Sequence, residues 1–158
     1  MAVKIGLVGC GAIGAEIARA LDRGTINATL VAVCDHNPHT ASALIESMEH
    51  KPVKACLEEL VGLADIVVEA ASQKAVPAVA RAALGRGKSL MIMSVGALAD
   101  RELYAEVKRL AADKGARVYL PSGAIAGLDG LKSASLGGIR SITLTTTKNP
   151  RGLQGAPY

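Results

Sequence analysis

VKIGLVGCGAIG, residues 3–14, joins an apolar run to a turn with the glycine spacing G-x-G-x-x-G. After the turn, apolar residues recur at helical spacing at Ile13, Ile17 and Leu21. A second apolar run then ends at the acidic residue Asp35, 21 residues after Gly14. The stretch therefore predicts a strand, a tight turn and a helix, with an acid at the end of the next strand.

Each glycine of this turn has a separate role in binding a dinucleotide. Gly9 permits the sharp turn, and Gly11 has no Cβ to collide with a pyrophosphate lying on the backbone. Gly14 lets the helix approach the strand. The first helical turn, at Ala12 and Ile13, presents unpaired N–H groups and the positive end of the helix dipole. The turn thus predicts a phosphate site that needs no lysine.

Asp35 bears on the choice between the two nicotinamide dinucleotides. Its carboxylate can accept hydrogen bonds from both hydroxyls of the adenosine ribose, and it repels a 2′-phosphate, which favours NAD over NADP. Protonation of His36 would soften that preference, so NADP stays open. The alternative is a glycine-rich turn in an unrelated α/β protein, with Asp35 as an ordinary loop acid.

The composition narrows the function classes. Half of the 158 residues are hydrophobic, enough for the core of one domain, and no apolar run approaches the ~20 residues of a membrane span. The N-terminus lacks a signal-peptide pattern, and the three cysteines lack metal-ligand spacing, so we expect a cytoplasmic protein without a metal site. Cys10 is interpreted as a packing or loop residue, with a reactive thiol as the alternative.

The excess of basic residues lies near the end of the chain. The net charge is +4, and the excess follows Asp129, at Lys132, Arg140, Lys148 and Arg151. The chain has three tyrosines and no phenylalanine or tryptophan, so it offers few platforms for stacking nucleic-acid bases. We therefore expect an anion-binding surface or a solvated edge here, and no nucleic-acid partner.

Apolar runs alternate with helical periods along the chain. The expected strands are 3–8, 29–34, 66–69, 90–94 and 117–120, with a weak one at 53–55. The expected helices are 12–22, 40–48, 56–63, 75–86 and 101–114. Most strands are continuous apolar runs, which is typical of a parallel sheet covered by helices on both faces. The expected fold class is α/β, a Rossmann doubly wound parallel sheet.

Ligands of such sheets lie beyond the carboxyl ends of the strands. Besides the first turn and Asp35, three strand ends carry small residues, within 69–73, 94–97 and 121–124. Small side chains keep a crevice open for a flat ring and leave backbone groups as polar contacts. The further predicted cofactor contacts are Ala71, Ser72, Ser94, Gly96 and Ala124. The alternative is that these residues simply serve tight turns.

The pattern changes after Leu120. Residues 122–130 are too glycine-rich to predict a regular element, and a polar, β-prone run follows at 141–147. We therefore expect a dinucleotide-binding domain over residues 1–121. Residues 122–158 would begin a second, truncated α+β domain for substrate binding and dimerisation.

The chain resembles the L-aspartate dehydrogenases linked to NAD biosynthesis over nearly its whole length. The resemblance rests on residues 9–14 (GCGAIG), 69–76 (EAASQKAV), 94–100 (SVGALAD), 121–129 (PSGAIAGLD) and 145–150 (TTTKNP). The first stretch is generic, whereas the second, fourth and fifth are specific in combination.

The resemblance implies oxidative deamination of L-aspartate. Hydride would pass from Cα to C4 of the nicotinamide and give iminoaspartate, which hydrolyses to oxaloacetate or passes toward quinolinate. The turn that contains Ala124 would hold the nicotinamide near the substrate, and the second domain would build a homodimer. Lys148 and Asn149 are candidate partners for the substrate carboxylates, with exposed strand-end residues as the alternative.

One departure from the family concerns catalysis. Family members are longer, and their substrate-domain asparagine and catalytic histidine come after the region where this chain stops at Tyr158. The histidines present, His36, His39 and His50, belong to the adenosine side, out of reach of a substrate. We therefore expect a fragment or truncated product with no catalytic residue of its own. The alternative is a non-catalytic NAD-binding module or remnant.

Overall fold

The computed structural model describes residues 2–122, 127–145 and 147. Contacts divide the chain into two compact units, Met1–Pro121 and Ser122–Tyr158, and each is described by itself. That the second unit begins a substrate and dimerisation domain stays a prediction.

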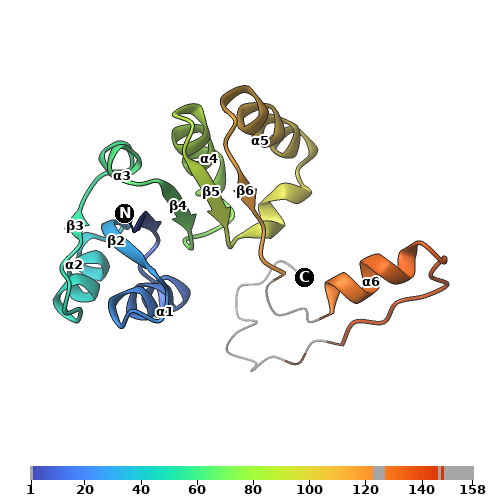
Figure 1. Cartoon of the computed structure of the whole chain (residues 1–158), viewed down its shortest axis with the longest axis horizontal. Coiled ribbons are helices and arrows are strands. Elements are labelled where there is room, and N and C mark those ends of the chain that lie inside the picture. Colours follow the sequence, from blue (N-terminus) through green and yellow to red (C-terminus); the bar gives the residue numbers. More distant parts are fainter. Residues whose placement is uncertain (1, 123–126, 146, 148–158) are drawn as a thin grey trace. The chain divides into compact units, whose positions relative to one another are not determined.

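The first unit is built on one six-stranded parallel sheet (Figure 1). Its strands are β1 (Val3–Val8), β2 (Ala28–Cys34), β3 (Val53–Lys54), β4 (Ile66–Glu69), β5 (Ser89–Ile92) and β6 (Val118–Tyr119). They lie in the order β3-β2-β1-β4-β5-β6, so the chain starts in the middle, winds outward to β3 and returns to continue from β4. This is the doubly wound Rossmann order, and the predicted α/β fold class is confirmed.

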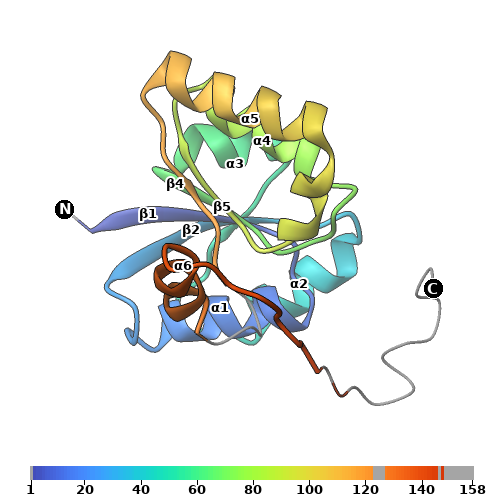
Figure 2. The same ribbon diagram turned by 90° about the vertical axis from the view of Figure 1, so that its right-hand side faces the viewer.

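Helices cover both faces of this sheet (Figure 2). One face carries α1 (Ala12–Asp22) and α2 (Pro38–Glu46), and the other carries α3 (Leu57–Leu63), α4 (Val76–Gly85) and α5 (Arg101–Lys114). Each face has its own core of aliphatic side chains, and the large apolar strand residues that are fully buried are Leu7, Val33, Val67, Leu90 and Ile92. Burial on both faces explains why the strands read as continuous apolar runs.

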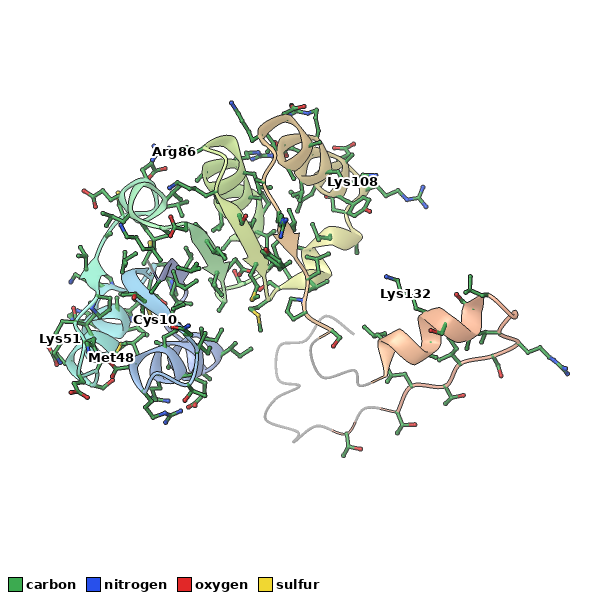
Figure 3. All side chains as sticks on the ribbon, in the orientation of Figure 1. Cys10, Met48, Lys51, Arg86, Lys108 and Lys132 are labelled. Atoms are coloured by element: carbon green, nitrogen blue, oxygen red, sulfur yellow. The ribbon has the colours of Figure 1, made fainter. Side chains whose placement is uncertain are left out.

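Helix ends follow the capping residues. Helix α2 begins at Pro38, two residues before the predicted start, because the side chain of Asn37 accepts a hydrogen bond of 3.0 Å from the N–H of His39. Helix α5 has the predicted bounds, since Asp100 caps its first turn and Gly115, with φ of 62°, ends it. Lys51 donates to carbonyl groups at the end of α2, including that of Ile45 (Figure 3).

The structure differs from three sequence-based expectations. Strand β5 ends at Ile92, and a short 3-10 helix, η1 (Val95–Ala99), follows where the strand was expected to continue to residue 94. In the second unit, helix α6 (Leu128–Ser135) begins within the last three residues of the glycine-rich stretch, where no regular element was expected. One glycine inside a helix costs only about 1 kcal/mol relative to alanine, so Gly130 is tolerated there. Residues 141–145 form no strand.

Among the helices of the described ranges, none has the length and apolar character needed to cross a membrane.

Helix α3 packs closely on the central strand β1. A Cβ placed on Gly6 would lie 2.5 Å from Cδ2 of Leu60, so the leucine occupies the space that a side chain at position 6 would need. Leu60 is fully buried, whereas Leu63, one turn later on the same helix, is 45% exposed. The two leucines therefore contribute differently to stability although they share a helix.

We expect Leu60→Ala to lower the free energy of unfolding by about 2–5 kcal/mol, because it removes buried apolar surface and leaves a cavity over Gly6. Leu63→Ala is the matched control and should cost less than about 1 kcal/mol. Urea denaturation followed by circular dichroism measures both values. Equal losses in the two variants would show that α3 does not pack as described.

Candidate functional site

The candidate site lies at the carboxyl ends of β1 and β4. These strands are neighbours, yet the helices that follow them, α1 and α4, cover opposite faces of the sheet. A crevice for ligands opens at such a switch point. The N–H of Ala70 donates to the carbonyl of Val8 at 2.8 Å, and the N–H of Gly9 donates to the carbonyl of Cys34 at 2.8 Å. Three strand ends are thus tied together at one edge.

Gly9 and Gly14 are required by the close approach of backbone segments. Gly9 has φ of 96°, and a Cβ there would lie 2.6 Å from the carbonyl group of Ala70 and the nitrogen of Ala71. A Cβ on Gly14 would overlap the carbonyl oxygen of Gly9. Both glycines therefore serve the fold itself, whether or not a ligand is bound.

Gly11 differs, because nothing in its surroundings excludes a side chain. No heavy atom lies within 4 Å of a Cβ built on it. It precedes α1 and caps it without a side-chain hydrogen bond, and the first turn of the helix carries no acidic residue. Ala12 and Ile13 are exposed there. The first N–H groups of a helix have no acceptor within it, so this open position fits an anionic group such as a pyrophosphate.

The carboxylate of Asp35 is held in place by two backbone N–H groups. Its Oδ2 accepts the N–H of Cys10 at 2.7 Å, and its Oδ1 accepts the N–H of Asn37 at 2.8 Å. Its side chain is 8% exposed, while that of His36, with Nδ1 at 3.1 Å from Oδ1, is 96% exposed. A carboxylate oxygen accepts more than one hydrogen bond, so Asp35 keeps capacity for a ribose hydroxyl. Its ribose contact stays a prediction.

Cys10 belongs to the core beneath α1 (Figure 3). Burial, followed by the charges of Asp35 and Cys34, raises the pKa of its thiol to about 11. The thiol is therefore protonated at neutral pH and is a poor nucleophile. This supports the packing interpretation over the reactive one.

Glu69 was not among the predicted site residues, although it organises two of the predicted loops. It ends β4 and is fully buried. Its Oε1 accepts the N–H groups of Ala71 (2.9 Å) and Ser72 (3.0 Å) and the hydroxyl of Ser94 (3.0 Å). Its Oε2 accepts the N–H of Ser94 at 3.1 Å. The sequence signal was a lone acid that closes an apolar strand and precedes small residues.

These bonds change how the strand-end residues could contact a cofactor. The sequence suggested backbone contacts from Ala71, Ser72 and Ser94, but their N–H groups point to Glu69. Contacts from these residues must therefore come from carbonyl groups or side chains. A Cβ on Gly96 would lie 2.5 Å from Nε2 of Gln73, so the two loops also meet at this point.

The remaining candidates are three residues of the second unit and the three histidines. Ala124, Lys148 and Asn149 lie outside the described residues. His36 and His39 flank the start of α2, and His50 follows the same helix, where its Nδ1 lies 3.1 Å from Oδ1 of Asp22. The histidines thus belong to the segment between β2 and β3, away from the ends of β4 and β5.

Comparison with known proteins identifies the relatives of this fold. Residues 9–121 match the family model described as "Homoserine dehydrogenase, NAD binding domain". The L-aspartate dehydrogenase of Methanocella arvoryzae is 52% identical over 98% of this chain and 57% of its own length. That of Methanosarcina mazei is 49% identical over 99% of this chain and 58% of its own. The chain thus spans somewhat over half the length of these curated relatives, and its resemblance to them is confirmed.

Solved structures share the fold at lower identity. The myo-inositol dehydrogenase of Lactobacillus casei, in complex with NAD(H) and myo-inositol, superposes with a TM-score of 0.72 at 22% identity, over 88% of this chain and 42% of that one. The biliverdin reductase of Synechocystis, in complex with biliverdin and NADP+, gives 0.68 at 23% identity, over 86% and 42%. These similarities support the Rossmann fold alone.

The contrast between Gly11 and Gly14 separates binding from folding. We expect Gly11→Ala to lower the affinity for NAD at least about tenfold, because the new methyl group occupies the pyrophosphate position. Its free energy of unfolding should change by less than about 1 kcal/mol, since the space is open. Gly14→Ala should instead destabilise the fold by about 1–3 kcal/mol. Calorimetric titration and thermal unfolding test both. Unchanged NAD affinity in Gly11→Ala would contradict the pyrophosphate position.

The ribose contact of Asp35 is tested against its neighbour in the same turn. Asp35→Ala should lower NAD affinity by about tenfold or more, through loss of charge-assisted hydrogen bonds. Asn37→Ala removes the cap of α2 at a cost of about 1 kcal/mol but leaves the carboxylate in place, so its NAD affinity should stay near that of the wild type. Titration calorimetry compares the two. If Asp35→Ala binds NAD as well as the wild type, the assignment to the ribose is wrong.

Proposed function

Because the chain belongs to the L-aspartate dehydrogenase family and carries an NAD-binding domain, we propose that it takes part in the NAD(P)-dependent oxidative deamination of L-aspartate to iminoaspartate and oxaloacetate. The proposal is carried by the 52% identity to an L-aspartate dehydrogenase over 98% of the chain. The open position at Gly11, on the edge where doubly wound sheets bind ligands, supports it.

The described residues divide the work of holding the cofactor. The N–H groups at the start of α1, above Gly11, would bind the pyrophosphate, and Oδ2 of Asp35 would accept from the adenosine ribose. Ala71, Ser72, Ser94 and Gly96 would line the nicotinamide half through side chains and carbonyl groups, and Ala124 would lie near the ring. Bound NAD would supply the hydride acceptor for Cα of L-aspartate.

The proposal extends to the surroundings of the reaction. Asp35 favours NAD, with NADP as the second cofactor. L-Aspartate is the proposed small-molecule partner. The proposed location is the cytoplasm and the proposed assembly is a homodimer. The proposal includes no nucleic-acid or membrane partner. The second candidate function is a non-catalytic NAD-binding module. It is favoured by the positions of His36, His39 and His50, all of which lie between β2 and β3 in the chain, whereas β4 and β5 lie on the other side of β1 in the sheet.

NADH formation by purified residues 1–158 with L-aspartate tests whether these residues contain the group that exchanges a proton with the substrate, which is a histidine in the resembled family. We expect NAD to bind without turnover, because the described residues place no histidine near the nicotinamide half. Turnover by this chain would contradict the assignment of that group to another segment.

The same assay on the product of the complete reading frame that contains this chain separates the two functions. NADH formation with L-aspartate, and none with homoserine, is the outcome expected of an aspartate dehydrogenase. NAD binding without turnover of either substrate would leave the non-catalytic module.

A further inference from the structure

We propose that Glu69 is the positioning residue of the nicotinamide half of the site, holding the loops after β4 and β5 at a fixed separation. The inference deepens the proposed function and rests on it, because it assumes that NAD binds at this edge. It assigns to Glu69 a role in ligand geometry that does not require the carboxylate to touch the ligand.

The burial of Glu69 calls for a physical reason. It is fully buried, and among the residues with described side chains no other charged or polar residue is as deeply buried. Removing a carboxylate from water costs several kcal/mol unless hydrogen bonds replace the lost solvation. A hydrophobic residue would end the strand at no such cost, so the charge at this position has a use other than packing.

That use is visible in the four hydrogen bonds that Glu69 accepts. Two come from the loop after β4, at Ala71 and Ser72, and two come from Ser94, after β5. The donors are three backbone N–H groups and one hydroxyl, all neutral. Because a neutral side chain of similar shape cannot accept all four, the distance between the two loops depends on the carboxylate.

The other half of the site has a separate carboxylate with the same arrangement. Asp35 directly follows β2, and it accepts N–H groups from Cys10, in the loop after β1, and from Asn37, in the loop after β2. Each acid therefore joins two loops. Asp35 serves the adenosine half and Glu69 the nicotinamide half, and among the described residues neither side chain forms a hydrogen bond with the loops of the other half. The two halves should respond separately to loss of their own acid.

Glu69→Gln tests this division, with NAD and ADP-ribose as paired ligands. ADP-ribose contains the adenosine half and the pyrophosphate but lacks the nicotinamide ring. Glutamine keeps the shape and one acceptor oxygen, but its amide nitrogen cannot accept the N–H of Ser94. Calorimetry should show that the ratio of NAD to ADP-ribose affinity falls at least about fivefold, while ADP-ribose affinity stays within about twofold of the wild type. The fluorescence of bound NADH, which reports on the nicotinamide ring, should shift toward that of free NADH.

Asp35→Asn is the matched control, since it makes the same change from acid to amide at the other pair of loops. It should weaken NAD and ADP-ribose by similar factors. Ser94→Ala is a milder second variant, in case Glu69→Gln fails to fold. It removes one of the four bonds and should lower the same affinity ratio by a smaller factor.

Three results would overturn the inference. In Glu69→Gln or Ser94→Ala, an equal loss of affinity for NAD and for ADP-ribose would reveal a general structural role. Unchanged affinity for both ligands would show that neither half of the site depends on these bonds. A wild-type chain that binds neither ligand would overturn the proposed NAD function, and the inference with it. Because that result appears without any substitution, it is distinguishable from the other two.

Discussion

The close approach of the backbone at Gly9 to the backbone at Ala70 is the constraint on which the rest of the site depends. A Cβ at position 9 would lie 2.6 Å from the atoms of the next strand end, and φ of 96° already favours glycine there. The hydrogen bond from Ala70 to Val8 fixes the same junction. Because this contact joins the two winding directions of the sheet, the positions of α1 and of the loop after β4 follow from it.

At this edge of the sheet, the acidic side chains accept hydrogen bonds from the protein, and the N–H groups at the start of α1 are left for an anionic ligand. Asp35 and Glu69 are the two acids of this edge, and their oxygens accept hydrogen bonds from backbone N–H groups and a hydroxyl. The start of α1 carries no acid in its first turn, so its N–H groups remain for a ligand. The two acids thus stiffen the loops around the crevice and leave the phosphate position positive.

Much of the fold could be predicted from the sequence, because the signals are local. β1, β4, α1 and α5 have their predicted bounds, since apolar period, capping residues and glycine stops lie within a few residues of each other. Helix α6 was missed because its one glycine, Gly130, follows Gly123 and Gly127 closely in the sequence, and together they hid the helix-favouring residues that follow.

The candidate site was less accessible to sequence analysis. The role of Glu69 depends on its contact with Ser94, 25 residues away, and on its complete burial, neither of which has a local signature. The inward direction of the N–H groups of Ala71 and Ser72 has the same origin. Small residues indicated where the loops lie, but the direction of their donors depends on tertiary contacts.

The edges of the sheet have a consequence for aggregation during folding. β3 and β6 each contain two residues, so neither edge strand itself offers another chain a long row of backbone groups, although β3 pairs with β2 only at Ala32 and Val33. The central strands are longer and apolar, and their parallel pairings join distant parts of the chain, which makes them slow to form. Self-association through strand addition is therefore a hazard above all of the unfolded or partly folded chain, during synthesis or refolding, before these central pairings have formed.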